Sequence, residues 1–254
     1  MKNPNLLKSL GAVALGLVLN IHPALFAGPR PPNPGVLPPG STPYGHTYGE
    51  WGALWWRWAL SIPIAENPVA DTTGEFAATG QRGPVWFLAG TFGGSATRTV
   101  TVPAGKALFF PIINSQWTTT CIGEPRTIEG IRPLVAPQID TATGLAAEID
   151  GVSVQNLDLY RAESPLFCTS LAIIGIYTPE DLAATCPPGE SNPDCTDLPN
   201  PKEHFGPKDG FGPSMADGVW LMLAPLKQGQ HTIHFMATGT GGFSLDVTYN
   251  LTVK

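Results

Sequence analysis

The sequence is poor in charged residues and lacks the motifs that mark the common enzyme classes. Charged side chains make up 13% of the 254 residues, against 43% for hydrophobic ones. It contains no nucleophile elbow, zinc-protease helix, phosphate-binding loop, dinucleotide fingerprint or EF-hand loop. No reaction can therefore be assigned from a motif, and a function has to be argued from a site.

Long apolar runs are also scarce, and the clearest one lies at the N-terminus. Ten apolar residues, Leu10–Leu19, follow Lys2 and Lys8 and precede a small residue, Ala27. This pattern predicts a signal peptide over residues 1–27, and hence a secreted or periplasmic protein. A membrane-spanning helix needs about 20 apolar residues, so we expect no transmembrane segment once the signal is cleaved.

Basic residues are outnumbered by acidic ones. The net charge is −6, and removal of Lys2 and Lys8 with the signal takes it to −8. Binding to phosphate backbones needs a basic surface, so the composition argues against nucleic acid as a partner. The partner that we expect is a small molecule or a glycan.

The four cysteines show no C-x-x-C spacing, which makes a zinc site the weaker interpretation. An even number of cysteines in an exported chain predicts two disulfides. Pairing within the proline-rich stretch 186–195 is the local choice, but three pairings remain open. The residues concerned are Cys121, Cys168, Cys186 and Cys195.

Turn-forming residues and alternating segments predict a mainly β protein. The chain has 29 glycines and 27 prolines, and its C-terminal residues 243–253 alternate apolar and polar side chains. We expect an antiparallel β-sandwich, jelly-roll-like, with a closed barrel of similar strands as the alternative. Further strands are expected at 85–89, 98–102, 107–113, 219–226 and 230–238, with a hairpin at 148–154 that turns on Asp150-Gly151.

One strong helix is expected before these strands. Thr47 and Glu50 form a capping-box pattern, and Pro63 ends the helical stretch. Its three-tryptophan stripe, Trp51, Trp55 and Trp58, is typical of core packing. A weaker helix is expected at 127–136 and a short one at 178–184.

The domain organisation is one β-rich globular domain, residues 46–254, behind a proline-rich arm. Residues 28–45 hold seven prolines and are interpreted as an extended spacer. Residues 186–217 are interpreted as one long, cross-linked surface loop.

Two groups of residues are candidates for chemistry. His204, Asp209 and Asp217 fall in the expected long loop and can form a general acid–base site or bind calcium through oxygen ligands; the alternative is a solvated polar loop. Trp117, Tyr160, Arg161 and Glu163 can bind a polar ligand such as a sugar. In the alternative, Arg161 and Glu163 pair with each other and Trp117 belongs to the core.

Three segments resemble a group of exported bacterial proteins that has no assigned function. They are Tyr48–Pro63 with its clustered tryptophans, Gly83–Gly90 (GPVWFLAG) and Val102–Pro111 (VPAGKALFFP). The resemblance implies export and a single domain, and it supplies no catalytic residues.

Three functions remain open on these grounds. The first is a binding module for a carbohydrate or a similar polar ligand. The second is a hydrolase, calcium-assisted in one version, that acts on glycans or small esters and lactones. The third is a structural or interaction protein of the cell envelope.

Overall fold

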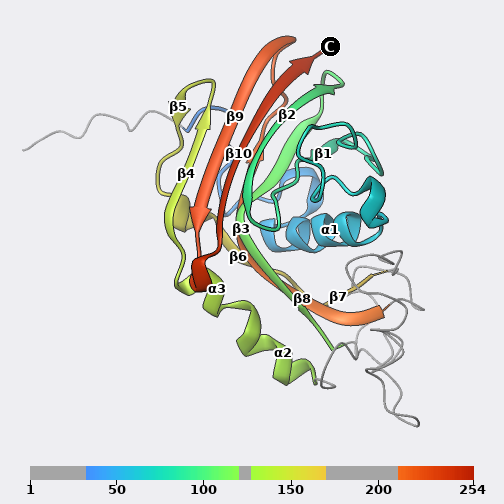
Figure 1. The fold of residues 1–254 in the computed structure, drawn as a ribbon, viewed down its shortest axis with the longest axis vertical. Coiled ribbons are helices and arrows are strands. Elements are labelled where there is room, and N and C mark those ends of the chain that lie inside the picture. Colours follow the sequence, from blue (N-terminus) through green and yellow to red (C-terminus); the bar gives the residue numbers. More distant parts are fainter. Residues whose placement is uncertain (1–32, 120–126, 170–210) are drawn as a thin grey trace, which may run out of the picture. The chain divides into compact units, whose positions relative to one another are not determined.

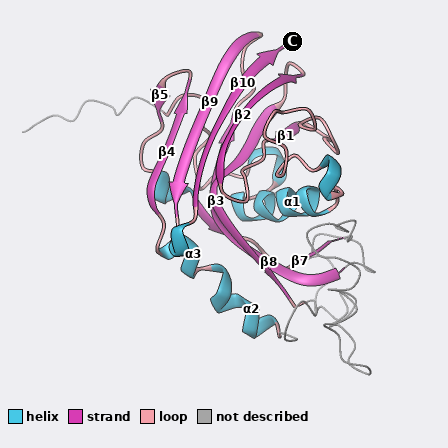
Figure 2. Ribbon diagram, in the orientation of Figure 1, coloured by secondary structure: helices cyan, strands magenta, loops and turns pink. Residues whose placement is uncertain are grey.

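The protein is mainly β, as the sequence predicts, and its strands form two five-stranded sheets. The structure is a computed structural model, and it describes residues 33–119, 127–169 and 211–254. Figures 1 and 2 show the two sheets side by side, with helix α1 against one of them. The arrangement is that of a β-sandwich with an N-terminal, tryptophan-rich helix.

The first sheet has the strand order β1-β3-β8-β6, and β7 also pairs with β8. Its strands are β1 (Val85–Phe87), β3 (Ala107–Thr118), β6 (Arg161–Glu163), β7 (Phe167–Thr169) and β8 (Phe211–Leu223). The second sheet has the order β2-β10-β9-β4-β5. Its strands are β2 (Gly94–Val102), β4 (Thr143–Ile149), β5 (Val152–Ser153), β9 (Gly229–Thr238) and β10 (Ser244–Val253).

Each sheet contains one parallel pair in addition to the antiparallel pairs. β1 runs parallel to β3, and β2 runs parallel to β10 over nine paired residues. Residues Val102–Ala107 lead from β2 in one sheet to β3 in the other. This connection joins the two sheets, so β2 and β3 do not form a hairpin.

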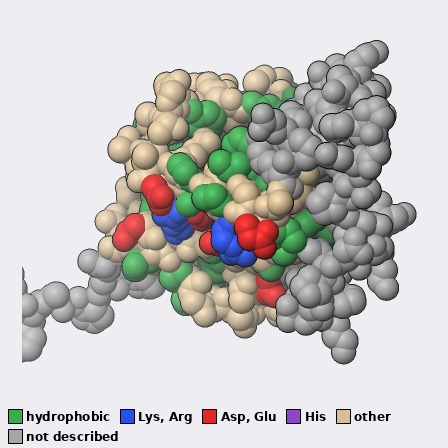
Figure 3. Space-filling model, turned by 90° about the horizontal axis from the view of Figure 1, so that it is seen from below, with side chains coloured by type: hydrophobic (Ala, Val, Ile, Leu, Met, Phe, Trp, Pro, Cys, Tyr) green, Lys and Arg blue, Asp and Glu red, His purple; other side chains and the backbone are tan. Residues whose placement is uncertain are grey.

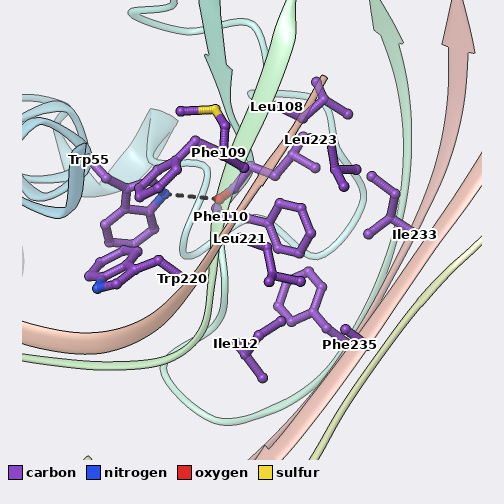
Figure 4. Close-up of a cluster of buried hydrophobic side chains, with 14 of the residues drawn as sticks. Trp55, Leu108, Phe109, Phe110, Ile112, Trp220, Leu221, Leu223, Ile233 and Phe235 are labelled. Atoms are coloured by element: carbon purple, nitrogen blue, oxygen red, sulfur yellow. Dashed lines mark hydrogen bonds between the residues drawn. The ribbon is translucent and has the colours of Figure 1, made fainter. Parts of the chain in front are cut away.

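The first sheet is buried on both faces. On one face Phe110 contacts Phe235 of the second sheet at 5.2 Å between ring centroids. On the other face Phe109 stacks on Trp220 at 5.4 Å, and Trp55 of helix α1 lies 5.8 Å from Trp220. Figure 4 shows these two groups of side chains on opposite sides of the strands. Burial on both faces explains why β3 is a continuous apolar run.

Helix α1 (Tyr48–Leu60) has the predicted cap. Both halves of the capping box are present: the Glu50 backbone N–H donates to Thr47 Oγ1, and the Thr47 N–H donates to the Glu50 carboxylate. Trp55 is buried and donates from Nε1 to the Leu88 carbonyl at 2.9 Å. The helix lies close to β6, because a Cβ on Gly49 would come within 2.2 Å of the Glu163 carbonyl oxygen.

The remaining helices are short. The expected helix at 127–136 is confirmed as α2 (Ile128–Val135), which Thr127 caps. α3 (Pro137–Asp140) follows it directly. The 3₁₀ turns are η1 (Pro43–Gly45), η2 (Ile64–Glu66), η3 (Leu157–Tyr160) and η5 (Thr240–Gly242). None of the helices in the described ranges is long and apolar enough to cross a membrane.

The described part of the proline-rich segment is attached to the sandwich. The Leu37 N–H donates to the Met222 carbonyl at 2.8 Å, and the Ala224 N–H donates to the Gly35 carbonyl at 2.8 Å. Backbone hydrogen bonds thus join the described part of the arm to the end of β8.

The expected long loop ends earlier than predicted. Residues 211–217 belong to β8, which pairs with β3 from Ser214 onward. Asp217 is consequently a strand residue with 3% exposure, and not a loop residue. Gly212 and Pro213 are turn-forming residues, and they are the reason that the sequence predicts a loop here. The expected short helix at 178–184 lies outside the described residues.

The hairpin that turns at Asp150-Gly151 is confirmed, and its Asp150 pairs with His231 of β9. Asp150 and Gly151 have φ of 52° and 75°, the positive values of a type I′ turn. His231 Nδ1 lies 2.7 Å from the Asp150 carboxylate, and its Nε2 lies 2.8 Å from the Lys227 carbonyl. Both partners are acceptors, so both ring nitrogens carry a proton when both bonds form, and the hydrogen bond to Asp150 raises the pKa of His231.

We expect this pair to make stability fall as the pH rises. A raised folded-state pKa favours the folded state below the ordinary value of 6.5, and this gain is lost as the pH passes through the raised value. The effect is on the order of 0.5 kcal/mol, because Asp150 is half exposed. Urea unfolding at about pH 5.5 and about pH 8.5 measures it. Asp150→Asn should remove this part of the pH dependence and Asp158→Asn should keep it; equal profiles for the two variants would contradict the assignment.

Candidate functional site

A pocket of about 630 Å³ lies between α3, strands β6 and β8, and the segment that follows β5. One part of its lining is apolar and comes from four segments of the chain: Ile139, Leu145, Val154, Leu157 and Val219. The rest is polar: Asp140, Gln155, Asn156, Asp158 and Arg161. We call this cavity the Arg161 pocket.

Arg161 is the fixed cation of the pocket. Its Nη2 and Nε donate to Asp217 Oδ2 at 2.6 and 2.9 Å, and its Nη1 donates to Asp140 Oδ1 at 2.6 Å. Strand pairing explains the first contact, because Arg161 aligns with Val219 and Glu163 with Asp217 on neighbouring strands. The hydrogen bonds that Arg161 donates to Asp217 are the largest cause of its raised pKa, so the guanidinium stays charged.

Two polar side chains at the rim of the pocket are available to a ligand. Among the described residues, neither the Asn156 amide nor the Asp158 carboxylate has a hydrogen-bond partner, although both line the pocket. Asn156 has a left-handed backbone with φ of 56°, a conformation that asparagine tolerates better than most residues. Donor and acceptor groups are therefore available beside a cation that is already held in place.

Figure 3 shows the end of the molecule that faces down in Figure 1, close to α2 and α3. Basic and acidic side chains lie next to one another there, among hydrophobic ones. The ion pair of Arg132 with Glu163, at 3.2 Å, is more exposed than the pair of Arg161 with Asp217. Exposed pairs of this kind contribute little to stability.

The predicted ligand-binding residues are not all brought together. Arg161 lines the pocket, whereas Tyr160 is 5% exposed and its ring contacts Tyr48 in the core. Glu163 pairs with Arg132, so the expected Arg161–Glu163 pair is wrong. Glu163 is paired with Arg132 of α2 instead, and Arg161 is paired with Asp217 of β8 and with Asp140 of α3. Trp117 is partly buried against Ile131, Val135 and Met215.

Of the three predicted catalytic residues, only Asp217 lies within the described residues. Asp217 is bound to Arg161 beneath the pocket, while His204 and Asp209 lie outside the described residues. The hydrolase and its calcium site therefore stay predictions. Within the described ranges no cluster of three or more His, Cys, Asp or Glu side chains can hold a metal ion. His231 and His234, which are three residues apart on β9, have separate partners, Asp150 and Asp246.

Cys168 is the one cysteine that lies within the described residues. This residue is completely buried, packs near Ile128 and Leu166, and does not carry a free thiol. Cys121, Cys186 and Cys195 lie outside the described residues, so the pairing stays a prediction.

Sequence reasoning missed Asp140 and did not single out Asn156 as a pocket residue. Asp140 lies at the end of a four-residue helix, and nothing in its neighbourhood marks it as a partner of Arg161. Asn156 lies between the β5 segment and a 3₁₀ turn, and its left-handed backbone becomes apparent only in the structure.

Comparison with known proteins gives no relative: no family model, no curated protein and no solved structure matches the chain. Fold and site together define the class, a mainly β sandwich with a partly polar pocket at one end.

Proposed function

We propose that the protein is exported and binds a polar, hydroxyl-bearing ligand, such as a carbohydrate, in the Arg161 pocket. One observation carries the proposal: a fixed guanidinium, an uncommitted amide and an uncommitted carboxylate border an apolar surface in a single cavity. Small-ligand sites typically have this composition and enclose roughly 300–1,000 Å³.

The chemistry of a sugar suits this arrangement. Its hydroxyl groups donate and accept hydrogen bonds, which Asp158, Asn156 and Arg161 can satisfy together. Its C–H faces can lie against Leu145, Leu157 and Val219. Because Asp217 and Asp140 already orient the guanidinium, little side-chain entropy is lost when the ligand binds. The predicted signal peptide supports a place of action outside the cytoplasm.

A glycan array, followed by calorimetry on the best glycan, tests the proposal. Asp158→Asn and Asn156→Ala should each weaken binding by about tenfold or more, because each removes a hydrogen bond that the ligand needs. Asp246→Asn is the matched control: it removes an exposed carboxylate on β10 and should leave binding unchanged. Binding that survives the double variant Asn156→Ala/Asp158→Asn would contradict the site, and a blank array would contradict the function.

A further inference from the structure

A second pocket, of about 480 Å³, lies between α1 and the segment that leads into β1. Arg57 and Trp58 line it from the helix, and Arg82, Pro84 and Phe87 line it from the other side. It shares no lining residue with the Arg161 pocket. We call it the Arg57 pocket.

The charge of this pocket has one sign. Arg57 and Arg82 are the charged residues of its lining, which contains no carboxylate. Among the described residues neither guanidinium makes an ion pair or a hydrogen bond, in contrast to Arg161 and Arg132, which are both paired. Arg57 is half-buried, and this burial lowers its pKa without any compensating charge. Arg82 is exposed, but a partly buried cation such as Arg57 is costly without a partner, which makes an absent anion the simplest complement.

The pocket also has an aromatic surface, to which α1 contributes Trp51 and Trp58 and β1 contributes Phe87. Phe87 lies 5.4 Å from Trp58 and 6.1 Å from Trp51, measured between ring centroids. The two indole N–H groups are already used, by the Thr79 and Pro43 carbonyls, each at 2.9 Å. These rings therefore offer carbon surface to a ligand and no hydrogen-bond donors.

Close backbone approach keeps this wall in place. A Cβ on Gly80, where φ is 67°, would lie 3.2 Å from the Trp58 ring, and Gln81 binds the Phe87 backbone through two hydrogen bonds. Lys106 donates to the Gly83 carbonyl and so adds a third cation near this end of the molecule. The pocket thus combines an anchored aromatic surface with unpaired positive charge on an acidic protein.

We propose that the Arg57 pocket binds a small organic carboxylate that carries a ring-sized apolar body. The guanidinium fork pairs with a carboxylate through two parallel N–H···O bonds, and the body packs against Trp58 and Phe87. A neutral ligand of the same shape leaves the arginines unpaired, while a bare anion leaves the aromatic wall uncovered. This site is independent of the carbohydrate site proposed above.

Benzoate is the probe that tests this inference on the mature full-length protein, with benzyl alcohol, acetate and inorganic phosphate as comparisons. Calorimetry gives the affinities, and tryptophan fluorescence reports on Trp51 and Trp58. We expect benzoate to bind about tenfold more tightly than any of the other three. Arg57→Gln and Arg82→Gln should each weaken benzoate binding about tenfold, while the matched control Arg132→Gln should not change it.

Several outcomes would overturn the proposal. They are no benzoate binding by the wild-type protein, equal binding of benzyl alcohol, or benzoate binding that survives the double variant Arg57→Gln/Arg82→Gln. Phosphate that binds as tightly as benzoate would overturn the apolar body as part of the ligand. Thermal melting separates misfolding from lost binding: the double variant removes two unpaired cations and should melt no lower than the wild type. Binding to the Arg161 pocket should persist in that variant.

Discussion

Replacing Arg98 with methionine is expected to lower the free energy of unfolding by about 3–5 kcal/mol. Arg98 projects inward from β2 and is 1% exposed. Its guanidinium donates to the carbonyls of Asp71, Ala89 and Gly90 at 2.7, 2.6 and 2.9 Å. It also donates to the Tyr249 hydroxyl at 2.7 Å. Methionine fills a similar volume but leaves these four acceptors without the cation that satisfies them.

The carbonyl geometry makes lysine a poor substitute. The acceptors surround a planar fork that Arg98 fills from Nε, Nη1 and Nη2, and a single ammonium group cannot reach all of them. Arg98→Lys should therefore recover only part of the loss. Arg132→Met is the matched control, because the side chain is 59% exposed and its pair is worth less than about 1 kcal/mol. Urea unfolding measures all three, and an Arg98→Met variant within 1 kcal/mol of the wild type would show that the carbonyls find other partners.

The alternation in β2 predicts that Arg98 points inward, but it does not identify the partners of the guanidinium. Arg98 shares its parity with Val100 and Val102, so the alternation places it on the inward face. A lone arginine in such a position has no visible partner in the sequence, because its acceptors are three backbone carbonyls, those of Asp71, Ala89 and Gly90, and the hydroxyl of a tyrosine 151 residues away. The partners exist only after β2 has paired with β10.

Local chemistry explains the parts of the fold that the sequence predicts well. The capping box at Thr47, the turn at Asp150-Gly151 and the alternation of β10 each depend on residues within a few positions of one another. The parallel pairs β1–β3 and β2–β10 depend on contacts between segments that are far apart in the sequence. The alternation of apolar and polar side chains does not specify which residues of two such strands pair. Residues 211–217 became part of β8 because β3, β6 and β7 supply partners for them.

The same division holds for the candidate site. Arg161 and Asp217 were both selected from the sequence, but in separate groups with separate roles. Their contact joins residues 56 positions apart and follows from the pairing of β6 with β8. The choice of residue types was informative, because a buried carboxylate and a half-buried arginine rarely occur without a partner. The identity of the partner depended on topology.

Replacing Trp220 with alanine is the second change for which we expect a loss of about 3–5 kcal/mol in the free energy of unfolding. Trp220 is fully buried, stacks on Phe109 at an interplanar angle of 10°, and donates from Nε1 to the Ala162 carbonyl at 3.2 Å. It joins helix α1 to the first sheet, as Figure 4 shows for its contact with Trp55. Trp220→Phe should cost less, because it keeps an aromatic ring on Phe109.

The surroundings of Trp220 are the reason to expect the upper part of this range. Cβ atoms added to Gly52 and Gly218 would lie 3.1 and 2.9 Å from the ring, so the indole occupies a slot between two residues without side chains. Glycines have nothing to move into the space that alanine leaves, and the cavity persists. Val219→Ala is the matched control on β8, since Val219 lines the Arg161 pocket. We expect it to cost less stability than Trp220→Ala, and a reversed order in urea unfolding would mean that the helix and sheet close around the missing ring.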